Sequence, residues 1–243
     1  MKTDYLYALE NIFPNKKLRR IILSITSNCN SRCKTCSLWK KKTQDKLTLV
    51  DFEKLANEAS FKSVRFLVLT GGEPFLRQDI DKIVNLFKKA NPRLHITILT
   101  NALLPELITK KVKNMSRDVL ITLSFNGKPE THDETRGIRG NFEKLLETLE
   151  KLRKLKQPVN FIFTVTKENH SQLLWAWDFA KKNNINILFS PEMEYERLDV
   201  EKGRGLTSEQ KKTVLSQLKK IYSQRKRPFF DDTYFCFFRK LYE

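Results

Sequence analysis

Residues 29–36 read CNSRCKTC and hold three of the chain's four cysteines, at the spacing C-x3-C-x2-C. Thiolates are soft ligands for iron and zinc, and an iron–sulfur cluster is held by closely spaced cysteines. Three thiolates leave one iron of a four-iron cluster open to a ligand from outside the protein. The alternatives are a structural zinc site, which usually needs four ligands from paired knuckles, or three unrelated buried thiols. The chain has no second pair of closely spaced cysteines.

Apolar runs of strand length alternate with helix-like segments along most of the chain. Helical periodicity is clearest over residues 78–90, where Ile80, Ile83, Val84 and Phe87 recur on one expected helix face. Other helices are expected from Thr48 onward and over residues 104–114, 142–149 and 173–183. The expected strands are residues 21–26, 64–70, 95–100, 119–124, 159–166 and 185–190. Six alternating units predict an α/β fold, with a parallel sheet covered by helices.

The segments around these units complete the expected organisation. We expect a lead-in helix over residues 5–13, an exposed connection over residues 39–46 and a long loop over residues 125–140. The continuous apolar character of the first strand predicts that it is buried. A last helix is expected to begin at Thr207, with Gln210 completing a capping box. We therefore divide the chain into a principal unit, residues 1–205, and a C-terminal helix with an aromatic tail, residues 206–243, packed on it.

A second motif, GGEP at residues 71–74, follows the second expected strand. A cysteine loop after one strand and GGEP after the next resemble the radical S-adenosylmethionine (radical SAM) superfamily. The resemblance implies an α/β partial (β/α)6 TIM-type barrel with parallel strands and a short helical C-terminal tail, with its chemistry at the carboxyl ends of the strands. It also implies a [4Fe-4S] cluster on Cys29, Cys33 and Cys36, whose open iron binds S-adenosyl-L-methionine (SAM).

The same resemblance assigns a set of contacts to SAM. The GGEP motif would hold the ammonium group, because glycines permit close approach and a carboxylate accepts from a cation. Asn101 lies in TNA after the third strand, where the family has TNG, and a turn-forming asparagine is the alternative. Thr35 stands where the family often has an aromatic residue near the adenine, so that contact must be weaker or supplied elsewhere. The implied SAM-binding residues are Gly71, Gly72, Glu73, Pro74, Asn101, Ser124 and Arg136.

Residues 124–137 resemble the pattern S-x-D-G…H-D…R-G of radical SAM enzymes that modify peptides. The resemblance implies that Ser124 and Arg136 help to hold the carboxylate of SAM. Asn126 replaces the Asp of the pattern, which removes a charge and puts in doubt any role that needs a carboxylate there. We interpret His132 and Asp133 as a helix-capping or loop-bracing pair.

The fourth cysteine, Cys236, stands apart from the other three. Peptide-modifying relatives of the SPASM type continue into a cysteine-rich extension with auxiliary clusters, and the resemblance here is to a core without it. One cysteine cannot hold such a cluster. A buried thiol among Phe235, Phe237 and Phe238, a protein without the extension, and a fragment of a longer enzyme all stay open.

The implied activity is reductive cleavage of SAM to a 5'-deoxyadenosyl radical that abstracts hydrogen from a substrate, with a peptide or protein favoured. A net charge of +18 keeps RNA or a nucleotide-type substrate open. The alternative of another class is a non-catalytic metal-binding module with a basic nucleic-acid-binding surface, with Cys236 or His132 as fourth ligand. An electron donor such as flavodoxin or ferredoxin is implied as a partner. Neither an 18-residue apolar run nor a signal pattern is present, so we expect a cytoplasmic protein without a membrane span.

Overall fold

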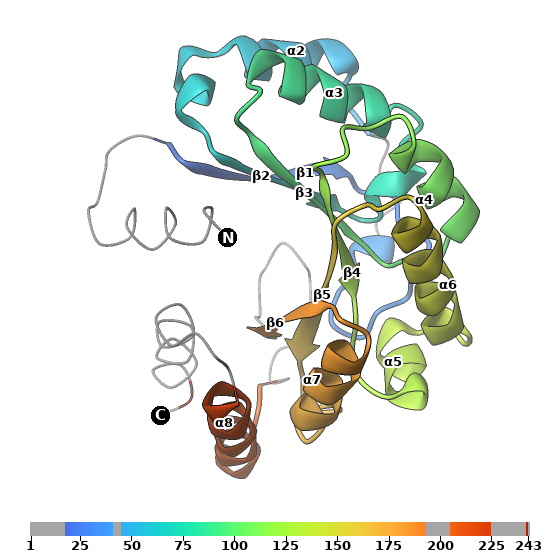
Figure 1. Cartoon of the computed structure of the whole chain (residues 1–243), viewed down its shortest axis with the longest axis vertical. Coiled ribbons are helices and arrows are strands. Elements are labelled where there is room, and N and C mark those ends of the chain that lie inside the picture. Colours follow the sequence, from blue (N-terminus) through green and yellow to red (C-terminus); the bar gives the residue numbers. More distant parts are fainter. Residues whose placement is uncertain (1–17, 41–44, 193–204, 225–241, 243) are drawn as a thin grey trace.

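The computed structural model describes residues 18–40, 45–192, 205–224 and 242. Six parallel strands form one sheet in sequence order, which curves without closing (Figure 1). The expected partial barrel is therefore confirmed. The lead-in helix expected over residues 5–13 and the tail with Cys236 lie outside the described residues. The strands are β1 (Arg20–Thr26), β2 (Phe66–Gly71), β3 (His95–Thr100), β4 (Leu120–Ser124), β5 (Val159–Val165) and β6 (Asn186–Pro191).

Helices follow the strands and cover the convex side of the sheet (Figure 1). The face expected on α3 is confirmed, since Ile80, Ile83, Val84 and Phe87 are all buried. Three short 3-10 helices are η1 (Leu38–Lys40), η2 (Ala59–Ser63) and η3 (Pro74–Leu76). The α-helices are α2 (Leu49–Asn57), α3 (Ile80–Ala90), α4 (Pro105–Val112), α5 (Pro129–Arg136), α6 (Asn141–Lys154), α7 (Leu173–Lys182) and α8 (Ser208–Ser223).

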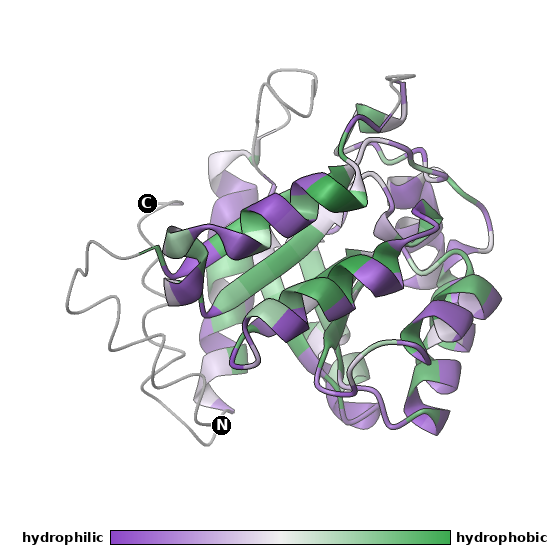
Figure 2. Ribbon diagram, turned by 90° about the horizontal axis from the view of Figure 1, so that it is seen from above, coloured by the Kyte–Doolittle hydropathy of each residue, from purple (hydrophilic) through white to green (hydrophobic). Residues whose placement is uncertain are grey.

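The two faces of the sheet differ in burial. Side chains that point toward the helices, such as Leu67, Ile98 and Phe161, are fully buried, and Figure 2 shows the apolar character of the sheet. The opposite face is concave and partly open. The expectation that the first strand is buried is wrong for most of its length, because β1 is an edge strand: Ile22 is 60% exposed and only Ile25 and Thr26 are buried.

The expectation of a loop over residues 125–140 is wrong for its central part, because residues Pro129–Arg136 form α5. Its sequence, PETHDETR, contains no apolar residue, so hydrophobic periodicity gives no signal. Proline at its first turn and Gly137 in the left-handed region just after it are the usual signals of a helix start and stop. The buried residues of α5 are both polar, His132 and Thr135.

The last helix begins as expected, since the Thr207 hydroxyl accepts from Gln210 N at 3.3 Å and Gln210 Oε1 accepts from Thr207 N at 3.0 Å. α8 packs on α7 through Gln217, whose side chain accepts from Leu174 N at 3.3 Å and donates to His170 O at 2.7 Å. The division at residue 205 stays a prediction. None of the helices described here is long and apolar enough to cross a membrane.

Candidate active site

A cavity of about 160 Å³ opens at the carboxyl ends of the first four strands, beside the loop that carries the cysteines. It brings together most of the residues predicted from the sequence, which come from four separate stretches of the chain. Glu73 and Pro74 are buried next to it and are not among its lining residues. The predicted site residues that line it are Cys29, Cys33, Cys36, Gly71, Gly72, Asn101, Ser124 and Arg136.

The three thiols share this cavity without converging on one point. Among the described residues, no three His, Cys, Asp or Glu side chains are placed to hold a single metal ion. A four-iron cluster with one open iron takes three cysteines, whereas a structural zinc ion usually takes four ligands. Three thiols in one cavity are therefore the donor set that such a cluster needs. His132 is fully buried and does not line the cavity, so its suggested role as a fourth ligand is wrong.

The middle of the cysteine loop is docked on the carboxyl end of α5. Arg32 N donates to Arg136 O at 3.0 Å and Lys34 N to Thr135 O at 2.9 Å. The Ser31 hydroxyl also donates to Arg136 O, at 3.0 Å. A methyl group at Gly137 would lie 2.3 Å from Arg32 O, so only glycine allows this approach. The helix missed from the sequence thus positions the cysteines.

The two glycines of GGEP let one backbone approach another. Gly72 N donates to Thr26 O at 2.8 Å, and Glu73 N donates to Asn28 O at 2.7 Å. A methyl group at Gly71 would lie 2.1 Å from Thr26 O, and one at Gly72 would lie 2.1 Å from Asn28 O. These contacts lock the end of β2 to the start of the cysteine loop and leave both glycines facing the cavity.

The carboxylate of Glu73 is fully engaged inside the protein. It accepts from the Thr100 hydroxyl at 2.8 Å, Asn101 N at 2.7 Å and Phe75 N at 3.2 Å. Burial raises the pKa of this carboxyl, while the three donors and the nearby Arg136 charge act in the opposite direction. Glu73 thereby joins η3 to the end of β3, and its contact with the ammonium group of SAM stays a prediction.

Asn101 reaches from the end of β3 to the cysteine loop. Its side-chain amide donates to Asn30 Oδ1 at 2.7 Å, and its Oδ1 accepts from Leu103 N at 3.0 Å. Ala102 has a φ of 60°, which is the left-handed conformation that glycine adopts most easily. Position 102 therefore has the backbone conformation that suits the glycine of the family's TNG, although this chain has alanine there.

Arg136 carries the positive charge of the cavity. Its Nε is buried and has no hydrogen-bond partner among the residues that the structure describes, and its charge influences Cys29 and Glu73. Burial raises the pKa of the Cys29 thiol, and Arg136 opposes that rise. A buried guanidinium donor without a partner fits the carboxylate of a bound ligand.

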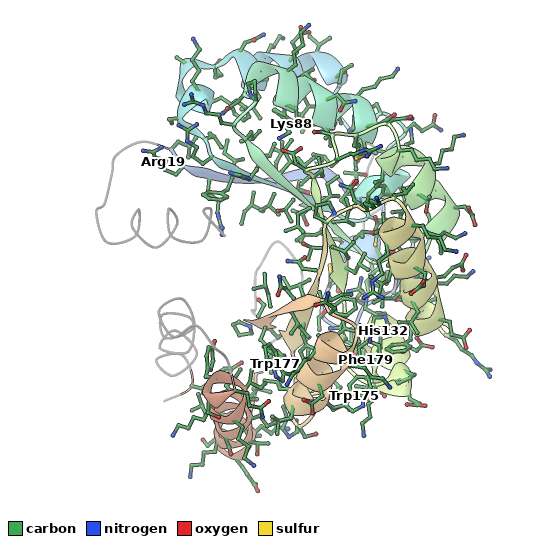
Figure 3. All side chains as sticks on the ribbon, in the orientation of Figure 1. Arg19, Lys88, His132, Trp175, Trp177 and Phe179 are labelled. Carbon is green, nitrogen blue, oxygen red and sulfur yellow. The ribbon has the colours of Figure 1, made fainter. Side chains whose placement is uncertain are left out.

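His132 and Asp133 brace α5, as expected from the sequence. His132, on α5 (Figure 3), accepts through Nδ1 from Asn126 N at 3.1 Å. Burial, and then the Arg136 charge, lower the pKa of His132 to about 3. The Asp133 carboxylate accepts from Gly140 N at 2.5 Å and Phe142 N at 2.8 Å, at the start of α6. The histidine is therefore a neutral structural residue.

Sequence reasoning missed three residues around the cysteine loop. Trp39, which was placed in an exposed connection, is half-buried and lines the cavity, with its Nε1 donating to Cys33 O at 3.4 Å. Its distance of only three residues from Cys36 is the signal that could have revealed it. Asp45 and Arg77 hold the two ends of the loop, and no pattern in the sequence marks them.

Comparison with known proteins agrees with this geometry. Residues 23–180 match the radical SAM superfamily. A GTP 3',8-cyclase of Nautilia profundicola is 27% identical over 228 residues, which are 88% of this chain and 67% of that protein. An AdoMet-dependent heme synthase of Methanosarcina barkeri is 29% identical over 168 residues, which are 68% of this chain and 47% of that protein. The chain thus spans about half to two thirds of the length of these two relatives.

Solved structures with the same fold include two proteins that are described with S-adenosylmethionine bound. Streptococcus suis SuiB bound to S-adenosylmethionine has a TM-score of 0.71 at 16% identity, covering 92% of this chain and 52% of that chain. AnSMEcpe with bound AdoMet has a TM-score of 0.65 at 22% identity, covering 85% and 60%. Because the family match covers well over half of its residues, the chain belongs to the radical SAM superfamily, whose members use a [4Fe-4S] cluster and SAM.

Proposed function

We propose that Cys29, Cys33 and Cys36 hold a [4Fe-4S] cluster and that the adjoining cavity binds SAM. When bound and reduced by a donor such as flavodoxin or ferredoxin, the cluster supplies the electron that cleaves SAM to methionine and a 5'-deoxyadenosyl radical, which abstracts hydrogen from the substrate. The observation that carries the proposal is the meeting of all three thiols with Gly71, Gly72 and Arg136 in one cavity. Such an enzyme would work in the reducing environment of the cytoplasm.

Each side of the cavity offers a group suited to one part of SAM. The Arg136 guanidinium, with the Ser124 hydroxyl beside it in the lining, would bind the carboxylate. Backbone groups at Gly71 and Gly72 would accept from the ammonium group. Trp39 is the one aromatic side chain among the described lining residues, and it would contact adenine in place of Thr35. The Arg32 guanidinium and the Lys40 ammonium lie over its ring at 5.1 and 5.4 Å, so one of them would have to give way to the base.

The favoured substrate is a peptide or protein. Support comes from the pattern at residues 124–137 and from structural neighbours described with peptides, including SuiB bound to its precursor peptide SuiA. A nucleotide-type substrate is the second candidate, because curated relatives that cover 72–88% of this chain are GTP 3',8-cyclases or probable ones. Comparing the two candidate classes by how strongly each stimulates 5'-deoxyadenosine release would separate them.

Electron paramagnetic resonance after anaerobic reconstitution and reduction tests the proposal. We expect about four irons per chain and a four-iron signal that changes when SAM is added, because SAM would coordinate the open iron. The triple variant Cys29→Ala, Cys33→Ala, Cys36→Ala should lose both the iron and the signal. Cys236→Ala is the matched control and should retain both. A signal indifferent to SAM in the unaltered protein would contradict the proposed function.

Arg136→Gln should weaken SAM binding by about 10- to 100-fold, since a charge-assisted hydrogen bond is worth about 1.5–3 kcal/mol. Equilibrium binding to the reconstituted protein measures this loss. Arg139→Gln, an exposed arginine just past α5, is the control. Because the Arg136 carbonyl that holds the loop is retained, iron content should stay near that of the unaltered protein. Equal affinity in the Arg136 variant would exclude this contact.

A further inference from the structure

The two ends of the cysteine-bearing loop meet at one arginine. Nη1 of Arg77 donates to Ile25 O at 2.9 Å and to Leu47 O at 3.0 Å. Ile25 lies just before the loop and Leu47 just after it, so 21 residues separate two carbonyls that share one guanidinium nitrogen. The Ile25 bond is buried, and the Leu47 bond is partly buried. The arginine therefore closes the segment that carries all three cysteines of the site.

Other contacts fix the guanidinium in place. Asp79 accepts from Nε and Nη2 of Arg77, both at 2.9 Å, in a bidentate pair. The ring of Phe52 lies 5.2 Å from the guanidinium carbon. The Arg77 side chain is only 8% exposed, so loss of the guanidinium would leave the buried Ile25 carbonyl and the partly buried Leu47 carbonyl without this donor. Lysine cannot reproduce this arrangement, because it lacks the planar fork that satisfies a carboxylate and two carbonyls together.

A second closure lies close to the first. The Asp45 carboxylate, near the far end of the loop, accepts from the Thr26 hydroxyl at 2.6 Å, Ser27 N at 3.0 Å and Asn28 Nδ2 at 3.3 Å. Asp45 is exposed, so its bonds are weaker than those of Arg77. Both closures are made entirely by protein groups.

We propose that Arg77 is a positioning residue that joins the two ends of the cysteine-bearing segment, at Ile25 and Leu47, and so holds the cysteine loop in place for the cluster. Asp79 orients its guanidinium, and Asp45 adds the outer closure. Arg77 does not line the cavity and touches no predicted ligand of the cluster. Its effect on cluster retention rests on the proposed function, whereas the closure is made by protein groups alone.

Limited trypsin digestion of the iron-free protein tests the closure directly. Lys40 and Lys46 lie inside the closed segment and provide cleavage sites. Arg77→Lys and Asp79→Asn should each raise the rate of cleavage at these sites by about tenfold, because bonds to a charged group hold the loop shut. The milder Asp79 variant keeps the arginine and carries the test if Arg77→Lys unfolds in urea at much lower concentrations.

Lys88→Gln is the matched control. Lys88, on α3 (Figure 3), also joins a carbonyl to a carboxylate, bonding Leu94 O at 2.9 Å and Asp118 at 2.5 Å, but it lies away from the loop. Its loss should leave cleavage at Lys40 and Lys46 within about twofold of the unaltered protein. Unchanged cleavage in both closure variants would overturn the proposal.

Iron release to a chelator gives the second measurement, on the reconstituted protein. We expect the Arg77 and Asp79 variants to release iron several-fold faster than the Lys88 variant. The rates are compared at urea concentrations that give the variants the same free energy of unfolding, so that a general loss of stability does not explain the difference. If the unaltered protein binds no cluster while the variants are still cleaved faster, the proposed function fails and the closure stands. If the cluster forms and the variants are cleaved and lose iron like the control, the closure is wrong and the function stands.

Discussion

We expect Gly72→Ala to lower the free energy of unfolding by about 3 kcal/mol, the upper part of the range for overpacking a well-packed site. The added methyl group would lie 2.1 Å from Asn28 O and 2.9 Å from Ser27 O, both backbone atoms that cannot rotate aside. The end of β2 and the cysteine loop would have to separate, which breaks the bonds from Gly72 N and Glu73 N. Urea unfolding measures the loss, and cluster reconstitution should fail in the same variant.

Gly205→Ala is the control for this prediction. In the described part of the chain no heavy atom lies within 4 Å of a methyl group at Gly205, so its substitution should change the free energy of unfolding by less than about 0.5 kcal/mol. If Gly72→Ala proves as mild as Gly205→Ala, then the end of β2 is not locked to the cysteine loop. The glycine would then matter only for contact with a ligand.

The second large effect is a pH dependence that comes from His132. Burial and the Arg136 charge lower its pKa from 6.5 to about 3. Between these values the unfolded chain takes up a proton that the folded chain excludes, so the folded state loses stability as the pH falls below 6.5. The loss should reach roughly 2 kcal/mol at pH 5, at about 1.4 kcal/mol per pH unit.

His132→Gln isolates this contribution. Glutamine can still accept from Asn126 N but does not titrate, so the variant should be less stable than the unaltered protein at pH 7.5 and approach it at pH 5. Urea unfolding at both values measures the difference. His170→Gln is the control, because His170 is partly exposed and its Nδ1 pairs with a backbone carbonyl, Lys167 O, at 2.8 Å. A difference between the His132 variant and the unaltered protein that stays constant with pH would refute the assignment.

The sheet and most helices could be predicted because their signals are local. α3 shows its apolar face in the order of its residues, and each strand is a run of apolar residues. The cysteine loop and GGEP could be placed near each other for a similar reason, since both follow parallel strands whose carboxyl ends share one edge of the sheet. The structure brings these two stretches into backbone contact, as that reasoning requires.

The rest depended on contacts between residues far apart in sequence. α5 is polar throughout, so its burial is decided by the cysteine loop about 100 residues earlier rather than by its own pattern. Arg77 is one of 46 basic residues, and nothing local distinguishes it from those at the surface. Trp39 lies only three residues after Cys36, which places it near the cysteine loop. Whether its ring points toward the cavity depends on η1, which the sequence does not indicate.

α5 also has a consequence for the stability of the cysteine loop. An isolated helix of eight polar residues has little stability in water, because it forms too few backbone hydrogen bonds to offset the unfavourable first turn. The carbonyls at its end are bonded by the amides of Arg32 and Lys34. The helix and the loop therefore stabilise each other, so a change that loosens one should loosen the other. Order in the loop that carries three cysteines thus depends on a polar helix about 100 residues further along the chain.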